Sequence, residues 1–235
     1  MKLFHYKNYI LLVSLFIFAL TGCATDQYGN ERPFTDAEKG VMIGAAIGVL
    51  AGLTTKNKKK KAILYGAVGG IAGGAIGSYM DSQKKDFEKQ LQDSIRSGDI
   101  TVDKLPNDIL MVTMTSQTAF DIDSTRIKPG FHDSMNRIAK IIKKYGQTHL
   151  SIVGHTDSTG SKSHNQKLSV KRAKSVYTYL SHQGIIEQRL AFYGMGENKP
   201  RADNATERGR TLNRRVEIVI EPVREDDHNH KDHKR

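Results

Sequence analysis

The stretch that decides the fold is Val153-Gly154-His155-Thr156-Asp157-Ser158-Thr159-Gly160. Residues 149–153 are mostly apolar and predict a short buried strand, and the Thr-Asp-Ser-Thr-Gly run that follows is typical of a turn. From Asn165 onward, apolar residues recur at helical spacing through Leu168, Ala173 and Val176. The sequence therefore predicts a strand, a polar loop and a helix in succession.

This arrangement resembles the OmpA-like C-terminal domain, a family of periplasmic modules that bind peptidoglycan. The family pattern is Gly-His-Thr-Asp, a loop of small residues, and then Asn-x-x-Leu-Ser-x-x-Arg-Ala. Here it stands at residues 154–157 and 165–173. The resemblance implies that Asp157 and Arg172 hold the diaminopimelate side chain of the peptidoglycan stem peptide.

The chemistry of diaminopimelate agrees with these two residues. Its free end carries an ammonium and a carboxylate on one carbon, so a binder needs one acid and one base close together. Arginine suits the carboxylate because its planar fork can bond it bidentately. Asn165, Ser169 and Arg172 share one helix face, which makes Thr156 and Asn165 candidate second contacts. The alternative is that Asp157 and Arg172 form an ordinary surface ion pair, worth roughly 0 to 1 kcal/mol.

Two further segments resemble the same family. Residues 120–124, Phe-Asp-Ile-Asp-Ser, are similar to its Phe-Asp element near the ligand pocket. Asp121 is therefore a candidate contact, with a turn or capping aspartate as the alternative. Residues 213–218, Asn-Arg-Arg-Val-Glu-Ile, match the start of a family strand. That match implies that Arg214 is a third ligand residue, near the carboxylate end of the stem peptide.

The periodicities fit an α+β fold. Apolar stripes predict helices over 129–145 and 165–183, and short strands are expected at 100–102, 109–114, 149–153, 190–193 and 216–221. The resemblance implies an OmpA-like βαβαββ sandwich, with one mixed sheet and helices on one face.

The start of the chain predicts a lipoprotein leader. Lys2 and Lys7 precede an apolar run at 10–20, which describes a secretory signal. The run ends Leu-Thr-Gly-Cys, which looks like a bacterial lipobox, so Cys23 is expected to carry the acyl chains that bury CH₂ groups in the membrane. A buried cysteine or a plain membrane anchor is the alternative. Ala24, where aspartate would favour the inner membrane, points to the outer membrane.

Glycines at every fourth position follow, at 44, 48 and 52 and then in two interleaved series from 66 to 77. Glycine weakens a helix in water by roughly 0.8 to 1 kcal/mol, but this spacing lets helices approach closely in lipid. The segment resembles a glycine-zipper helical hairpin. Residues 62–80 nearly suffice for a span of about 20 residues, whereas 41–53 are short. Five lysines at 56–61 either form a solvated loop or meet anionic head groups.

We expect a signal peptide at 1–22, a lipidated N-terminus and spacer at 23–40, the hairpin at 41–80, a connecting helix at 81–98, the OmpA-like domain at 99–223 and a charged disordered tail at 224–235. This combination resembles the YiaD type of envelope lipoprotein. The tail carries His228, His230 and His233, and weak metal binding is the alternative to disorder.

The function expected is that of a non-catalytic lipoprotein anchoring the outer membrane of a Gram-negative bacterium to peptidoglycan, with the C-terminal domain in the periplasm. Two attachments on one chain are stronger jointly than either alone. One alternative is an oligomeric membrane assembly or pore component immobilised on the wall. Another is a glycosidase using Asp121 or Asp123 with Asp157, although no residue pattern marks the raised pKa that this requires.

We expect neither a cofactor nor a metal. His155 and Asp157 could begin a metal site, but no third ligand stands at a recognisable spacing. The formal net charge of +11 owes much to the lysines at 56–61, so it does not by itself indicate a nucleic-acid surface. A leader that exports the chain also argues against a nucleic-acid partner. The partners expected are peptidoglycan, membrane lipid and a possible second copy.

Overall fold

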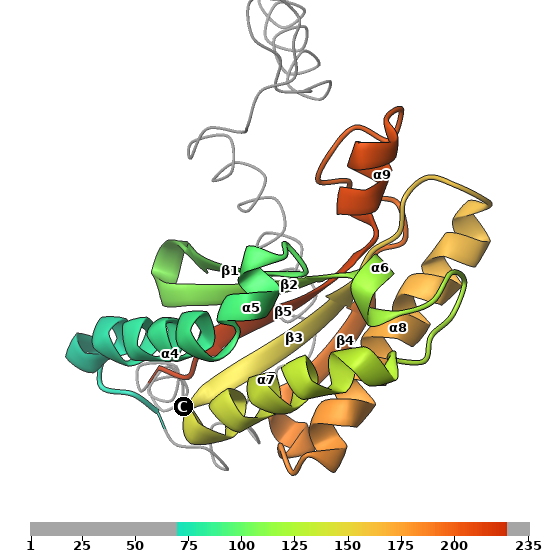
Figure 1. Cartoon of the computed structure of the whole chain (residues 1–235). Coiled ribbons are helices and arrows are strands. Elements are labelled where there is room, and N and C mark those ends of the chain that lie inside the picture. Colours follow the sequence, from blue (N-terminus) through green and yellow to red (C-terminus); the bar gives the residue numbers. More distant parts are fainter. Residues whose placement is uncertain (1–69, 225–235) are drawn as a thin grey trace, which may run out of the picture. The chain divides into compact units, whose positions relative to one another are not determined.

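The computed structural model describes residues 70–224, which Figure 1 shows in colour. The predicted signal peptide, Cys23, most of the glycine-zipper hairpin and the tail from residue 225 lie outside the described residues. Within 70–224, none of the helices is both long and apolar enough to cross a membrane.

Five strands form one mixed sheet in the order β1-β2-β5-β3-β4. β3 and β4 are parallel, and the other neighbouring pairs are antiparallel. Counted from β2, the main elements follow the predicted βαβαββ order, and β1 adds a strand at the edge. The strands are β1 (Ile100–Leu105), β2 (Ile109–Thr115), β3 (Thr148–Gly154), β4 (Leu190–Gly194) and β5 (Arg215–Pro222).

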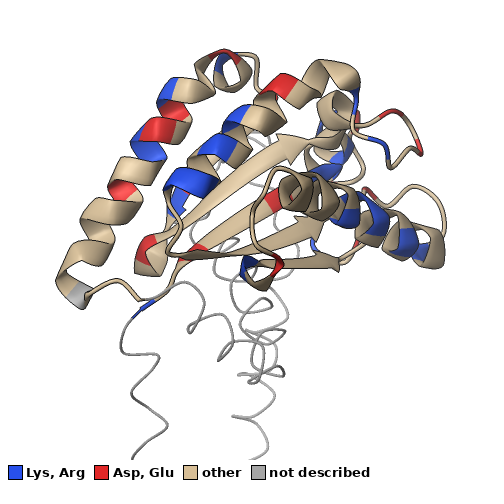
Figure 2. Ribbon diagram, turned by 90° about the horizontal axis from the view of Figure 1, so that it is seen from below, with Lys and Arg blue, Asp and Glu red and all other residues tan. Residues whose placement is uncertain are grey.

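The three longest described helices cover one face of this sheet (Figures 1 and 2), as predicted. The α-helices are α4 (Ile76–Gln90), α5 (Gln92–Arg96), α6 (Ser116–Ala119), α7 (His132–Lys144), α8 (Lys162–His182) and α9 (Glu207–Asn213). Short 3₁₀ turns are η2 (Gly73–Ala75), η3 (Pro106–Asp108), η4 (Pro129–Phe131) and η5 (Glu187–Arg189).

The main core lies between these helices and the sheet. Val216, Ile218 and Ile220 alternate along β5 and are fully buried in it, as the sequence pattern predicts. Since successive side chains of a strand face opposite sides, the intervening Glu217 and Val219 face the side away from the helices. A smaller apolar cluster occupies that second face, made of Leu105, Ile109, Met111, Val153 and Val219.

α4 is part of the domain core. Its buried side includes Ile76, Met80 and Phe87, which are 2%, 0% and 0% exposed. It packs beside α7, where the Tyr145 hydroxyl donates to Asp86 over 2.9 Å. The helix runs without a break across the boundary we placed between residues 80 and 81, because its apolar stripe begins at Ile76. Residues 76–80 therefore belong to a helix that packs on the sheet.

One end of the sheet is closed by a buried arginine. Arg189 donates to the backbone oxygens of Thr148, Ile142 and Tyr145 over 2.8 to 3.1 Å, and to the Thr148 hydroxyl over 2.8 Å. Burial lowers the pKa of Arg189 to about 10, so the guanidinium keeps its charge at neutral pH. It thereby satisfies carbonyls at the end of α7, which a helix terminus leaves without partners.

The described chain begins at this same end of the sheet. The backbone N–H of Ile71 donates to the oxygen of Val223 over 2.8 Å, just beyond the last residue of β5. Because β3 and β5 are antiparallel, this point lies at the opposite end of the sheet from Gly154 and the loop that follows it.

We predict that Gln83→Met stabilises the protein. Gln83 is 0% exposed on α4, and neither atom of its amide group has a partner within residues 70–224. Replacing this amide by an apolar chain of similar length should raise the free energy of unfolding by about 1 to 3 kcal/mol. Urea denaturation measures this change in the free energy of unfolding. Exposed Gln90 on the same helix is the control, and Gln90→Met should change stability by less than about 0.5 kcal/mol. A destabilised Gln83→Met protein would contradict the prediction.

Candidate ligand-binding site

The carboxyl ends of β3 and β4 meet the start of β5 at the end of the sheet away from Ile71. The segments that leave the strands are joined by backbone hydrogen bonds. His155 donates to the oxygen of Arg215, and Thr156 donates to that of Gly196, each over 2.9 Å. Three distant parts of the sequence therefore converge on the loop that carries Asp157.

α8 lies directly on the strand ends at this point. A Cβ atom at Gly154 would stand 2.1 Å from the backbone oxygen of Ser169, and one at Gly194 would stand 2.5 Å from the nitrogen of Val170. Only glycine leaves room for so close an approach. The helix begins at Lys162, earlier than the expected Asn165, because the Ser161 hydroxyl caps it by accepting the N–H of His164.

Asp157 is buried, and both of its carboxylate oxygens accept hydrogen bonds. Oδ1 accepts the N–H of Thr159 over 2.8 Å, which is a local turn bond typical of aspartate. Oδ2 lies 2.7 Å from Nη1 of Arg214. The ion pair of Asp157 is therefore with Arg214, not with Arg172 as in our alternative reading of these residues.

Arg172 is 5% exposed, and its guanidinium holds the loop at 121–124 by hydrogen bonds to the backbone of that loop. Its Nε donates to the oxygen of Ser124 over 2.9 Å and its Nη2 to that of Asp121 over 3.3 Å. Burial lowers the pKa of Arg172, while Asp123 and Asp157 oppose that shift. In the described part of the chain Nη1 has no hydrogen-bond partner, so this cation keeps a free donor.

Asn165 and Thr156 both lie beside Asp157, but they have different roles. The Asn165 amide donates to the backbone oxygen of Asp157 over 3.2 Å and to Glu197 over 2.6 Å, so it supports the loop. The Thr156 side chain is buried, and its hydroxyl has no partner among residues 70–224. That hydroxyl therefore has unused hydrogen-bonding capacity next to Asp157.

Asp121 takes a different position from the one we expected. Its carboxylate is 76% exposed and pairs with Lys128 over 3.3 Å. Its contribution to the site is the backbone oxygen that accepts from Arg172. The structure thus brings together Asp157, Arg172, Arg214, Thr156 and Asn165, while the Asp121 side chain is engaged elsewhere.

Arg214 links the site to α9. Its Nη2 lies 2.9 Å from Oε1 of Glu207, which also pairs with Arg210. Burial opposes the charge of Arg214, but the hydrogen bonds to Asp157 and Glu207 raise its pKa above the usual value. We expected only a polar loop here and missed Glu207. Thr206, which caps α9 by accepting the N–H of Gly209, is the signal that could have revealed the helix.

A buried charged cluster lies beneath the loop. Glu217 lies 2.7 Å from Nε of Arg215 and 3.3 Å from Nε2 of His155. Burial would raise the pKa of Glu217, but Arg215 and His155 hold it well below its usual range. Burial lowers the pKa of His155, Arg215 lowers it further, and Glu217 opposes both. No group of three or more His, Cys, Asp or Glu residues suited to a metal ion occurs within residues 70–224.

We predict that stability falls on acidification because of His155. Its Nδ1 is buried without a partner in the described residues, so protonation would add an unsatisfied donor. Its folded pKa is lowered, so the unfolded chain binds the proton first as pH falls. Stability should therefore be lost below about pH 6.5, by about 1 kcal/mol between pH 7.5 and 5.5.

Urea denaturation of the parent and of His155→Gln at the two pH values checks this. The variant should lose that part of the pH dependence, whereas His164→Gln, at an exposed position, should keep it. Equal pH dependence in the parent and His155→Gln would show that His155 is not the cause.

Residues 119–214 match the OmpA family, and residues 1–81 match the YMGG-like Gly-zipper. The probable lipoprotein YiaD of Escherichia coli is 34% identical over 208 residues, which cover 87% of this chain and 93% of that protein. The peptidoglycan-binding protein ArfA of Mycobacterium tuberculosis is 41% identical over 102 residues, 43% of this chain and 31% of that protein.

Among solved structures, the cell wall anchor of the T6SS from Pseudomonas aeruginosa is similar, with a TM-score of 0.53 and 27% identity. The match covers 58% of this chain and 96% of that one. Because the similarity to YiaD extends over most of both proteins, the chain belongs to the family of the probable lipoprotein YiaD, with an OmpA family domain that follows a Gly-zipper segment.

Proposed function

We propose that this protein is a non-catalytic anchor that joins a membrane of the bacterial cell envelope to peptidoglycan by binding the diaminopimelate of the stem peptide. The observation that carries the proposal is the buried acid, Asp157, beside two arginines at one end of the sheet. Relatives support it, because ArfA is named as peptidoglycan-binding and the similar structure is of a cell wall anchor.

The arrangement suits a group that carries both charges on one carbon. The ligand ammonium would meet the carboxylate of Asp157, whose two oxygens still have lone pairs beyond those used by Thr159 and Arg214. The ligand carboxylate would meet Nη1 of Arg172. Arg214 lies close enough to lower the pKa of Arg172, so a carboxylate near both would also relieve repulsion between the two cations.

The site is fixed before the ligand arrives. Arg172 is held by two backbone oxygens, Arg214 by two acids, and the loop of Asp157 by the Asn165 amide. Binding therefore orders few side chains and keeps most of the interaction energy. No bond of the ligand has to break, in keeping with an attachment role.

The membrane end of the anchor remains part of the proposal. Acyl chains on Cys23 and the glycine-zipper segment would hold the chain to the outer membrane, and the OmpA family domain would reach the wall in the periplasm. The relationship to a probable lipoprotein and the Gly-zipper match support this arrangement. Two moderate attachments on one chain hold jointly more strongly than either does alone.

We predict that the detergent-solubilised full-length chain co-sediments with sacculi whose stem peptides carry diaminopimelate. Asp157→Asn and Arg172→Gln should each weaken binding by about tenfold or more, because each leaves a charge of the ligand without its partner. Arg137→Gln is the matched control, since Arg137 is a half-exposed arginine paired with Asp133 on α7, away from the site. Pelleting over a range of sacculus concentrations gives the affinities.

Two measurements guard this test. Melting temperatures of the variants show whether they remain folded. Sacculi that carry lysine in place of diaminopimelate lack the second carboxylate, and they should retain the parent chain weakly. If the parent does not pellet, or if Asp157→Asn and Arg172→Gln bind like Arg137→Gln, the proposed function is wrong.

A further inference from the structure

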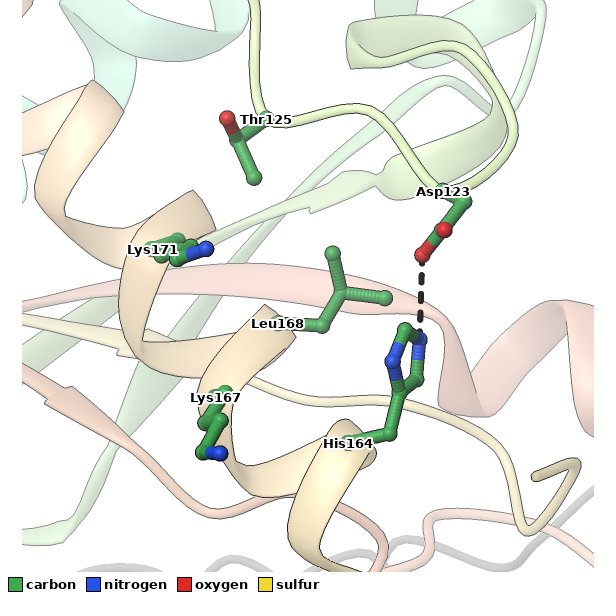
Figure 3. A pocket seen from close by; sticks show the side chains of 6 residues that line it. All are labelled: Asp123, Thr125, His164, Lys167, Leu168 and Lys171. Carbon is green, nitrogen blue, oxygen red and sulfur yellow. Dashed lines mark ion pairs between the residues drawn. The ribbon is translucent and has the colours of Figure 1, made fainter. Parts of the chain in front are cut away.

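A cavity of about 180 Å³ lies on the flank of the candidate site, between α8 and the loop that Arg172 holds. Figure 3 shows that α8 provides one wall and that this loop faces it from the other side. The lining residues are Asp123, Thr125, His164, Lys167, Leu168 and Lys171. None of them is used by the function proposed above.

The cavity carries uncompensated positive charge. Lys167 and Lys171 are exposed, and neither ammonium group has an ion pair or hydrogen bond in the part of the chain that the structure describes. Asp123 is the one acid among the six lining residues, and its Oδ1 lies 3.0 Å from Nε2 of His164 (Figure 3). The two lysines are therefore left to face the cavity without a partner acid.

The helix itself makes this charge unfavourable when no ligand is bound. α8 contains Lys162, Lys167, Lys171, Arg172 and Lys174 but no Asp or Glu, so it is drawn in tan and blue, with no red, in Figure 2. Lys167 and Lys171 are four residues apart, a spacing at which like charges repel. Lys162 lies in the first turn of the helix, where the helix dipole favours anions over cations. An anion in the cavity would relieve the repulsion between Lys167 and Lys171.

The cavity and the diaminopimelate site share one wall. The oxygen of Ser124 accepts from Arg172, and its neighbours Asp123 and Thr125 line the cavity. Asp123 also raises the pKa of Arg172, so the two sites lie within electrostatic reach of each other. A ligand that fills the candidate site with one carboxylate could therefore place another in the cavity.

We propose that Lys167 and Lys171 form a second carboxylate subsite, which takes a further carboxylate of the same stem peptide. This inference rests on the proposed function and extends it from a single residue to a longer peptide. The stem peptide offers such a group next to diaminopimelate, because the γ-linked glutamyl residue that precedes it keeps a free carboxylate. Leu168, on the cavity wall, provides an apolar contact for the intervening chain.

Calorimetry on the detergent-solubilised full-length chain tests the subsite. The ligands are free diaminopimelate, the tripeptide alanyl-γ-glutamyl-diaminopimelate, and this tripeptide amidated at the glutamyl carboxylate. The test variant is Lys167→Gln/Lys171→Gln. The matched control is Lys162→Gln/Lys174→Gln, which removes the same charge from the same helix at positions that do not line the cavity.

The test variant should bind the tripeptide about threefold to tenfold more weakly than the parent, with free diaminopimelate changed by less than about twofold. The tripeptide amidated at the glutamyl carboxylate should bind the parent more weakly by a similar factor and show no further loss with the variant. The difference in tripeptide affinity between the parent and the test variant should shrink at about 0.5 M salt, because salt screens exposed lysines. The control should behave like the parent.

Three results would overturn the subsite: an unchanged affinity of the test variant for the tripeptide, an equal loss for free diaminopimelate, or an equal loss in the control variant. Each is distinct from failure of the proposed function. If the proposed function were wrong, the parent itself would bind neither diaminopimelate nor the tripeptide, and Asp157→Asn would make no difference.

Discussion

The contact between α8 and the ends of β3 and β4 is the constraint on which the site depends. It exists because Gly154 and Gly194 present no side chain where the backbone of the helix crosses them. The Ser169 hydroxyl fills the remaining gap by accepting the N–H of Gly196 over 2.9 Å. With the helix seated there, Asn165 reaches the Asp157 loop and Arg172 reaches the loop at 121–124. A larger residue at either glycine would move all of these groups together.

The two arginines of the site are held by different means, and this gives them different electrostatic characters. Arg214 stands between two carboxylates, those of Asp157 and Glu207, so its charge is largely balanced. Arg172 is held by neutral backbone oxygens and is more deeply buried, so its charge is less compensated. Arg172 consequently gains more than Arg214 from an incoming anion, while Arg214 fixes the position of Asp157.

The strand, loop and helix around Asp157 could be read from the sequence because their signals are local: an apolar run, turn residues and helical spacing. The alternation of β5 was equally direct. The ion-pair partner of Asp157 could not be read in this way. Arg214 lies 57 residues away in the sequence, and only the fold determines which arginine lies beside Asp157. The boundary that we placed between residues 80 and 81 falls inside α4 for a related reason. Gly77 continues the spacing of the preceding zipper, whereas the buried stripe through Ile76 and Met80 is defined by packing on the sheet.

The position of Ile71 has a mechanical consequence. The described chain begins beside the last residue of β5, and Asp157 follows the last residue of β3, at the other end of the sheet. If the domain is held by a wall ligand and pulled through its N-terminal segment, the force runs along the strands. Hydrogen bonds between antiparallel strands are perpendicular to them, so the part of such a load that reaches the sheet acts in shear on the ladders between its antiparallel strands. Peeling, in which bonds fail one after another, would require a pull from the side of the sheet.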